Sequence, residues 1–199
     1  MVSADAIQRA VDVLRQGGVV AFPTDTLYGL AVDPRSADAV GRLFGIKGRQ
    51  AGHAVPLIAA SVEQASQAAA FDDRARRVAA AFWPGPVSIV VPAGELIRGE
   101  ILGAGRSVAV RVPAHSVARA LCQGFGFCVT ATSANISGKP PTASPKTVAN
   151  TLGALVDYVL DDGDSPGGQP STIVDLCGAE PRLVRAGAIA WERVLRSIQ

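Results

Sequence analysis

Hydrophobic and polar residues alternate along the chain in short blocks, and their spacing switches repeatedly between that of a helix and that of a strand. Near the N-terminus, Ser3 is a typical N-cap for a helix whose apolar residues share one face, and Gly17-Gly18 is a typical helix end. The apolar run 19–22 then predicts a buried strand. The alternation continues to an amphipathic helix predicted over 189–198.

The same pattern predicts the remaining elements and the fold class. Helices are predicted after capping residues at 36, 61 and 72 and over 114–122 and 144–152. Strands are predicted over 55–60, 87–91, 107–112, 127–131, 156–160, 171–176 and 182–185. Some strands follow one another without a helix between them, which a purely parallel sheet does not allow. We therefore expect an α/β fold with a twisted mixed β-sheet flanked by helices. No repeat or long linker interrupts it, so the expected domain is single and covers 1–199.

Composition excludes several classes of protein. With 48% hydrophobic and 18% charged residues, the chain is not intrinsically disordered. No apolar run approaches the roughly 20 residues that cross a bilayer, and the first residues do not resemble a secretory signal. We therefore expect a cytoplasmic protein without membrane contact. The net charge of +2 is too small to indicate nucleic-acid binding by itself.

Cysteine and histidine are too scarce for several kinds of site. The three cysteines, Cys122, Cys128 and Cys177, form no CxxC pair and are typical of reduced, mostly buried thiols. The two histidines, His53 and His115, are too few for a zinc site built from imidazoles, and packing explains each of them well. The chemistry must therefore rest on Lys, Arg, Asp, hydroxyl, amide and backbone groups.

Two polar segments stand out in the first quarter of the chain. Segment 23–30 follows a predicted strand directly, and ligand sites of α/β folds gather where strands end. On this segment alone, an Asp/Thr turn capping a short helix is the better interpretation. In an extended loop, Lys47 and Arg49 would point to the same side, with solvated heads that suit a polyphosphate. An ordinary basic helix end explains the two cations equally well.

Two more polar segments lie in the second half. Segment 130–138 runs from a strand into Ser-x-Asn and Ser-Gly, and its density of small hydrogen-bonding groups favours a ligand site over a plain turn. The acidic residues of 161–164 are more typical of a solvated turn than of a metal site. The glycines before Ser171 allow backbone N–H groups to surround a ligand. No GxxxxGK[ST] motif occurs, so a nucleotide site would be of another type.

Taken together, these segments resemble the YrdC family, the threonylcarbamoyl-adenylate synthases, over almost the whole chain. Each motif alone is weak, whereas seven in the same order are specific. The matching segments are 22–30 (FPTDTLYGL), 47–49 (KGR), 83–86 (WPGP), 108–113 (VAVRVP), 132–138 (TSANISG), 171–174 (STIV) and 183–187 (LVRAG). The family's K-x-R…S-x-N signature is met by Lys47, Arg49, Ser133 and Asn135.

The resemblance implies an activity and its partners. L-threonine, bicarbonate or CO2, and ATP would give threonylcarbamoyl-AMP and pyrophosphate, with Mg²⁺ bound to the ATP phosphates. A separate threonylcarbamoyl-transferase complex would then modify adenosine 37 of tRNAs, and weak contact with tRNA itself is possible. The implied fold surrounds a concave basic cavity.

The resemblance also implies residue roles. Lys47 and Arg49 would be the catalytic cations, which suits a reaction that needs charge neutralisation and alignment more than a protein nucleophile. Tyr28 would shape the pocket. The residues implied for threonine are Thr24, Arg111, Ala131 through its backbone, and Ser171. Those implied for ATP are Lys47, Arg49, Ser107, Ser133, Asn135, Thr142 and Arg185.

The sequence departs from the family pattern near the basic loop, and other functions compete with the implied one. Many relatives have Asn-Pro-Leu and then a His after the basic loop, where this chain has 55–57 (VPL) and a His53 within the loop. The chain ends soon after Arg185, as expected for the short form of the family. Alternatives are an RNA-binding module of the same fold, a carbamoyl-adenylate enzyme of the hydrogenase-maturation type, and a relative that has lost threonine activation.

Overall fold

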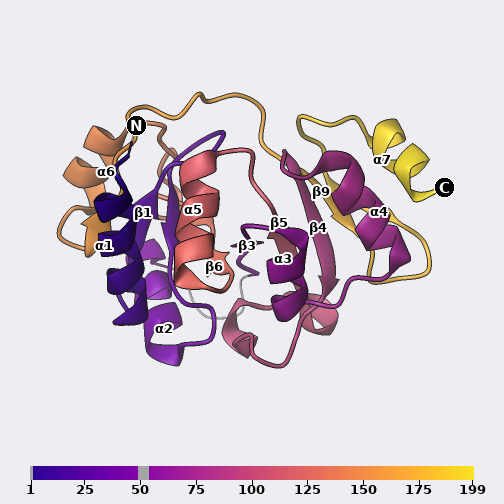
Figure 1. Ribbon diagram of the computed structural model, residues 1–199, viewed down its shortest axis with the longest axis horizontal. Helices are drawn as coiled ribbons and strands as arrows, with labels where there is room; N and C mark the ends of the chain where they lie inside the picture. The colour runs from indigo at the N-terminus through magenta and orange to yellow at the C-terminus, as the bar shows by residue number, and fades with distance from the viewer. Residues whose placement is uncertain (1, 49–53) are drawn as a thin grey trace.

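Two mixed β-sheets form the framework of the protein, whose computed structural model describes residues 2–48 and 54–199 (Figure 1). The first sheet has the order β7-β2-β1-β8 and the second the order β10-β9-β4-β5-β3-β6. The strands of the first sheet are β1 (Val20–Phe22), β2 (Gly29–Ala31), β7 (Thr132–Ser133) and β8 (Tyr158–Val159). Those of the second are β3 (Leu57–Ile58), β4 (Val87–Pro92), β5 (Ser107–Arg111), β6 (Val129–Thr130), β9 (Thr172–Asp175) and β10 (Arg182–Arg185).

Helices cover these sheets, and most begin where the sequence predicts. The side chains of Ser3, Ser36, Ser61 and Asp72 each accept a hydrogen bond from a backbone N–H of the first turn, which confirms these N-caps. Helix α1 packs against α5, and α4 packs against α7. The helices are α1 (Ala4–Arg15), α2 (Ala37–Lys47), α3 (Val62–Ala68), α4 (Asp73–Phe82), α5 (Ser116–Phe125), α6 (Pro145–Leu152) and α7 (Trp191–Ile198).

The mixed character of the sheets is confirmed, but the single predicted sheet is wrong. Strand β1 pairs antiparallel with β2 and parallel with β8, and β4 pairs antiparallel with β5 and parallel with β9. The predicted strand 127–131 explains the difference. Within it only Val129–Thr130 form a strand, β6 of the second sheet, and after Ala131 the chain joins the first sheet as β7. A hydrophobicity pattern does not reveal such a switch.

The segment after Pro23 also differs from the prediction, because it forms no helix. The Thr24 hydroxyl accepts from the N–H groups of Thr26 and Leu27 and donates to the Leu27 carbonyl at 2.7 Å, which closes a tight turn. The chain then enters β2, whose residues are all buried and pair with β1. The turn thus joins two buried strands and exposes its polar groups at their ends.

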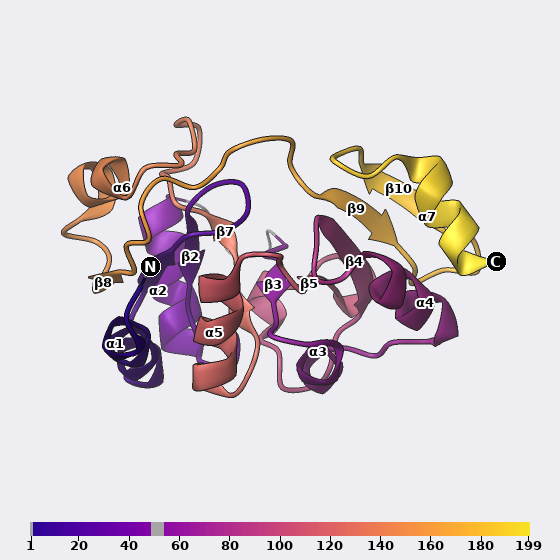
Figure 2. The ribbon, with the colours of Figure 1, turned by 45° about the horizontal axis from the view of Figure 1, so that its top comes forward.

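A long connection links the two sheets. After β8 the chain crosses from the first sheet to the second and enters β9 (Figure 2). On the way, the Ser165 N–H donates to the Ala143 carbonyl and the Gly167 N–H to the Thr26 carbonyl. This crossing brings Ser171 to the place where the sheets meet. Among the helices of the described residues, none has the length and apolar content to span a membrane.

Candidate active site where the two sheets meet

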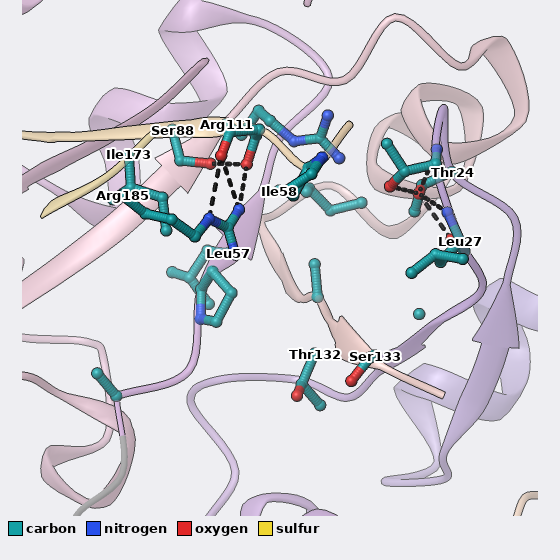
Figure 3. A pocket seen from close by; sticks show the side chains of 17 residues that line it. Thr24, Leu27, Leu57, Ile58, Ser88, Arg111, Thr132, Ser133, Ile173 and Arg185 are labelled. Carbon is teal, nitrogen blue, oxygen red and sulfur yellow. Dashed lines mark hydrogen bonds between the residues drawn. The ribbon is translucent and has the colours of Figure 1, made fainter. Parts of the chain in front are cut away.

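A cavity of about 350 Å³ lies between the ends of the two sheets, within the size range of small-molecule sites (Figure 3). The turn after β1 forms one wall, and Ser88 and Arg185 of the second sheet form the opposite wall. The predicted site residues that line it are Thr24, Arg111, Ala131, Ser133, Ser171 and Arg185. The structure therefore brings together residues up to 161 positions apart, between Thr24 and Arg185.

Arg111 is a buried cation at the end of β5. Its side chain is 11% exposed, and its Nη1 donates to Asp25 Oδ2 at 2.6 Å. The Asp25 carboxylate comes from the turn after β1, so this ion pair joins the first sheet to the second. A guanidinium has five N–H donors, and one bond to Asp25 leaves donors for a ligand.

Arg185, Ser171 and Ser88 form a second hydrogen-bonded group on the opposite wall (Figure 3). Arg185 Nη2 donates to the Ser171 carbonyl at 2.7 Å and to Ser171 Oγ at 3.1 Å. Ser171 Oγ also lies 3.0 Å from Ser88 Oγ, with either hydroxyl able to donate. Burial and the charge of Arg111 lower the pKa of Arg185, because the two positively charged guanidinium groups repel each other.

Among the described residues that line the cavity, the charged groups are two arginines and there is no carboxylate. Hydroxyl groups of Thr24, Ser88 and Ser171 surround them. The lining also has apolar residues from β3 and β9 and the residue before β3, namely Pro56, Leu57, Ile58 and Ile173. A cavity with this lining suits a small ligand that carries negative charge, a polar group and a short apolar part.

Lys47 lies behind this cavity and contacts the predicted Ser-x-Asn segment directly. Its ammonium donates to the Ser133 carbonyl at 2.7 Å, to Ser133 Oγ at 3.3 Å and to Asn135 Oδ1 at 2.7 Å. Lys47 of the K-x-R…S-x-N signature therefore meets the Ser-x-Asn part of it in space. Of the two interpretations of this segment, the basic helix end is confirmed for Lys47, which is the last residue of α2. The solvated lysine of an extended loop is wrong, because Lys47 is only 1% exposed. Gly48, in the left-handed conformation at φ 59°, ends the helix there.

The other predicted residues lie outside the cavity lining. The Ser107 hydroxyl donates to the Ala104 carbonyl, and the Thr142 hydroxyl accepts from the Ser144 N–H. Tyr28 is fully buried, and its hydroxyl donates to the Gly163 carbonyl at 2.8 Å, so it fixes the long connection rather than the cavity wall. Arg49 and His53 fall outside the described residues.

Two site residues escaped the sequence reasoning. Ser88 lies inside the apolar strand β4, is 4% exposed and is hydrogen-bonded to Ser171. Asp25 stands inside the recognised motif but had no role assigned to it. A polar residue within an otherwise apolar strand was the signal available for Ser88, because buried hydroxyls require partners.

The comparisons with known proteins agree with this geometry. The family described as "Telomere recombination", named for Sua5, YciO and YrdC, matches residues 12–187. The chain belongs to this family. Its α/β fold and its resemblance to the YrdC proteins are thereby confirmed.

Individual relatives extend the match. A threonylcarbamoyl-AMP synthase of Pyrococcus abyssi is 37% identical over 96% of this chain, which spans 57% of that protein. One of Thiobacillus denitrificans is 41% identical over 87% of this chain and 91% of its own length. The crystal structure of the P. abyssi Sua5 protein complexed with L-threonine has a TM-score of 0.90, with 96% of this chain and 57% of that one covered.

Proposed function

We propose that this protein is an L-threonylcarbamoyladenylate synthase, which converts L-threonine, bicarbonate or CO2, and ATP into threonylcarbamoyl-AMP and pyrophosphate. The observation that carries the proposal is the cavity, which gathers two arginines and several hydroxyls from six distant segments of a chain related to named synthases. The relative whose structure contains L-threonine supports the choice of amino acid.

Threonine fits the part of the cavity lined by Arg111 and Ser171. A guanidinium binds a carboxylate through paired hydrogen bonds, and Arg111 keeps donors for this purpose. The hydroxyls of Thr24 and Ser171 and the backbone of Ala131 supply the remaining polar partners. The apolar residues of the lining would contact the methyl group of the side chain.

ATP would bind to Ser133 and Arg185, the two residues of the ATP set proposed from the family pattern that line the cavity. Lys47 and Arg49 are the proposed catalytic cations, and the charge of Lys47 would act from beneath the Ser133–Asn135 segment that it holds. The described residues contain no group of three His, Cys, Asp or Glu side chains suited to a metal ion. We therefore propose that Mg²⁺ is held by the ATP phosphates, where it would neutralise their charge.

The reaction has two bond-forming steps. The threonine amino nitrogen attacks the carbon of CO2 and loses a proton, which gives a carbamate; from bicarbonate, water leaves as well. A carbamate oxygen then attacks the α-phosphorus of ATP, and the bond to pyrophosphate breaks. The chain's own contribution is to align the two substrates and stabilise the negative charge that moves toward pyrophosphate, as Arg185 and the two proposed cations could do.

The product implies partners outside this chain. The product is a mixed anhydride, which is a reactive acyl donor. A separate threonylcarbamoyl-transferase complex would transfer the threonylcarbamoyl group from it to adenosine 37 of tRNA. We place the protein in the cytoplasm with these partners, with tRNA contact at most weak. If the fold served as an RNA-binding module instead, filter binding would show tight, steeply salt-dependent RNA binding without ATP turnover.

Removing the hydroxyl of Ser171 should damage threonine use more than ATP use. We expect Ser171→Ala to raise the KM for threonine by about 2- to 10-fold, equivalent to the ~0.5–1.5 kcal/mol of one hydrogen bond, with a smaller change for ATP. Steady-state kinetics with each substrate varied in turn would measure this. The control is Ser66→Ala, an exposed serine on α3 whose hydroxyl bonds only within its helix. Equal damage to both substrates would reject the assignment.

Serine should be a poor substrate but not an excluded one. The missing methyl group would leave part of the apolar lining, which includes Leu57, Ile58 and Ile173, uncovered. Discrimination by one methyl in an apolar subsite is about 1–3 kcal/mol, so kcat/KM for serine should be roughly 10- to 200-fold below that for threonine. Competition between the two amino acids measures the ratio directly. A kcat/KM ratio near one would show that the cavity does not discriminate by the methyl group.

A further inference from the structure

Asp25 is placed to control Arg111 without forming part of the cavity wall. The Arg111 side chain lines the cavity, whereas Asp25 is absent from its lining and reaches the guanidinium from the turn after β1. The contact is short, at 2.6 Å between Asp25 Oδ2 and Arg111 Nη1, and the two side chains are 19% and 11% exposed. Low exposure strengthens a charge-assisted hydrogen bond and shields it from salt.

The charges around the cavity make such a contact necessary. Arg185 lines the same cavity, and its pKa is lowered by burial and by the charge of Arg111. Two like charges in a partly buried space repel, so an Arg111 side chain without a fixed partner would turn away from Arg185 or toward solvent. The carboxylate of Asp25 offsets one of the two positive charges and fixes the direction of the guanidinium.

The second oxygen of Asp25 argues against a purely structural role. Asp25 Oδ1 is buried and has no hydrogen-bond partner among the described residues. A buried carboxylate oxygen without a partner costs folding free energy, and residues that add no such cost could link the two strands equally well. Nearby His115 adds no further positive charge beside Asp25, because burial lowers the pKa of His115 and so favours its neutral form.

We propose that Asp25 is a positioning residue, which holds the Arg111 guanidinium toward the carboxylate of the amino-acid substrate. This inference rests on the proposed function, since it concerns the same threonine subsite. Asp25 acts through Arg111 and does not touch the substrate. Its removal should therefore weaken only the part of binding that depends on the substrate's carboxylate.

The test compares two ligands that differ at the carboxylate alone. L-threonine and L-threoninol, in which a CH2OH group replaces the carboxylate, are titrated calorimetrically into the wild type and into Asp25→Ala. We expect the variant to bind threonine at least about tenfold more weakly, as for the loss of a charge-assisted interaction, with threoninol affinity changed less than twofold. Asp25→Asn, which keeps an acceptor oxygen but no charge, should restore part of the threonine affinity.

Another ion pair of an aspartate and an arginine, away from the cavity, provides the control. Asp33 bonds the Arg35 guanidinium at 2.8 and 2.9 Å, and neither residue lines the cavity. Asp33→Ala should leave both affinities unchanged. Equal weakening of threonine and threoninol in Asp25→Ala, or no more weakening than in the Asp33 variant, would overturn the inference while leaving the proposed function in place. A wild-type protein that binds no threonine and releases no pyrophosphate would remove the proposed function and the inference together.

Discussion

Lys47→Ala is expected to lower the rate of pyrophosphate release by roughly 10²–10³-fold. This is the effect of losing a preorganised charge that stabilises the transition state by about 2.7–4 kcal/mol. The ammonium is 1% exposed and donates to the Ser133 carbonyl, Ser133 Oγ and Asn135 Oδ1. Its removal takes away both a cation near the proposed ATP side and the support of the Ser133–Asn135 segment. Lys47→Arg should restore only part of the rate, because a planar guanidinium does not reproduce a point charge.

The burial of this lysine adds an expected change in stability. Loss of the ammonium leaves the Ser133 carbonyl and the Asn135 amide oxygen, both in half-buried residues, without that donor, which should cost about 1–3 kcal/mol of unfolding free energy. Urea denaturation measures this loss of unfolding free energy separately from the change in rate.

Threonine binding without ATP should survive in the folded variant. Lys146→Ala, on the exposed face of α6, is the control and should match the wild type in both measurements. A folded Lys47→Ala protein with undiminished turnover would contradict the role proposed for Lys47.

Tyr28→Ala should destabilise the fold by about 3–5 kcal/mol, the range for deleting a large buried aromatic side chain. Tyr28 is fully buried, donates to the Gly163 carbonyl at 2.8 Å and accepts from the Asp162 N–H. Burial is the main cause that raises its pKa to about 12, with nearby aspartates adding to the shift, so the hydroxyl remains a donor at neutral pH. Tyr28→Phe, which keeps the ring, should cost only about 1–3 kcal/mol.

The comparison of these two variants separates packing from the hydrogen bond that fixes the long connection. Tyr158→Phe is the matched control, since the half-buried Tyr158 hydroxyl has no hydrogen-bond partner within the described ranges. Its unfolding free energy should lie within about 0.5 kcal/mol of the wild type. If Tyr28→Phe were as stable as this control, the hydroxyl would not hold the connection in place.

Local signals predicted much of the fold. Caps such as Ser36 and Asp72 act within one helical turn, so the residues themselves indicate where the helix begins. The strand β2 was missed because its first residue is a glycine and it follows a turn-forming segment. The division into two sheets was missed because it depends on pairing across long sequence distances, as between β2 and β7.

Those residues of the candidate site that lie in recognisable motifs were predictable from the sequence. Thr24, Arg111, Ser171 and Arg185 were expected from the family pattern, and the fold brings them to one cavity. The burial of Lys47 was not predictable, because a lysine at a helix end is normally solvated, and here tertiary contacts with Ser133 and Asn135 reverse this.

The most direct test of the proposed function is pyrophosphate release by the purified wild-type protein, measured with each substrate omitted in turn. With Mg²⁺ present, release should require L-threonine, bicarbonate and ATP together, and mass spectrometry should detect threonylcarbamoyl-AMP in the complete mixture only. Loss of release in the Arg111→Ala variant would link the activity to the cavity. Pyrophosphate release that persists without threonine, or no release from the complete mixture, would contradict the assignment as a threonylcarbamoyladenylate synthase.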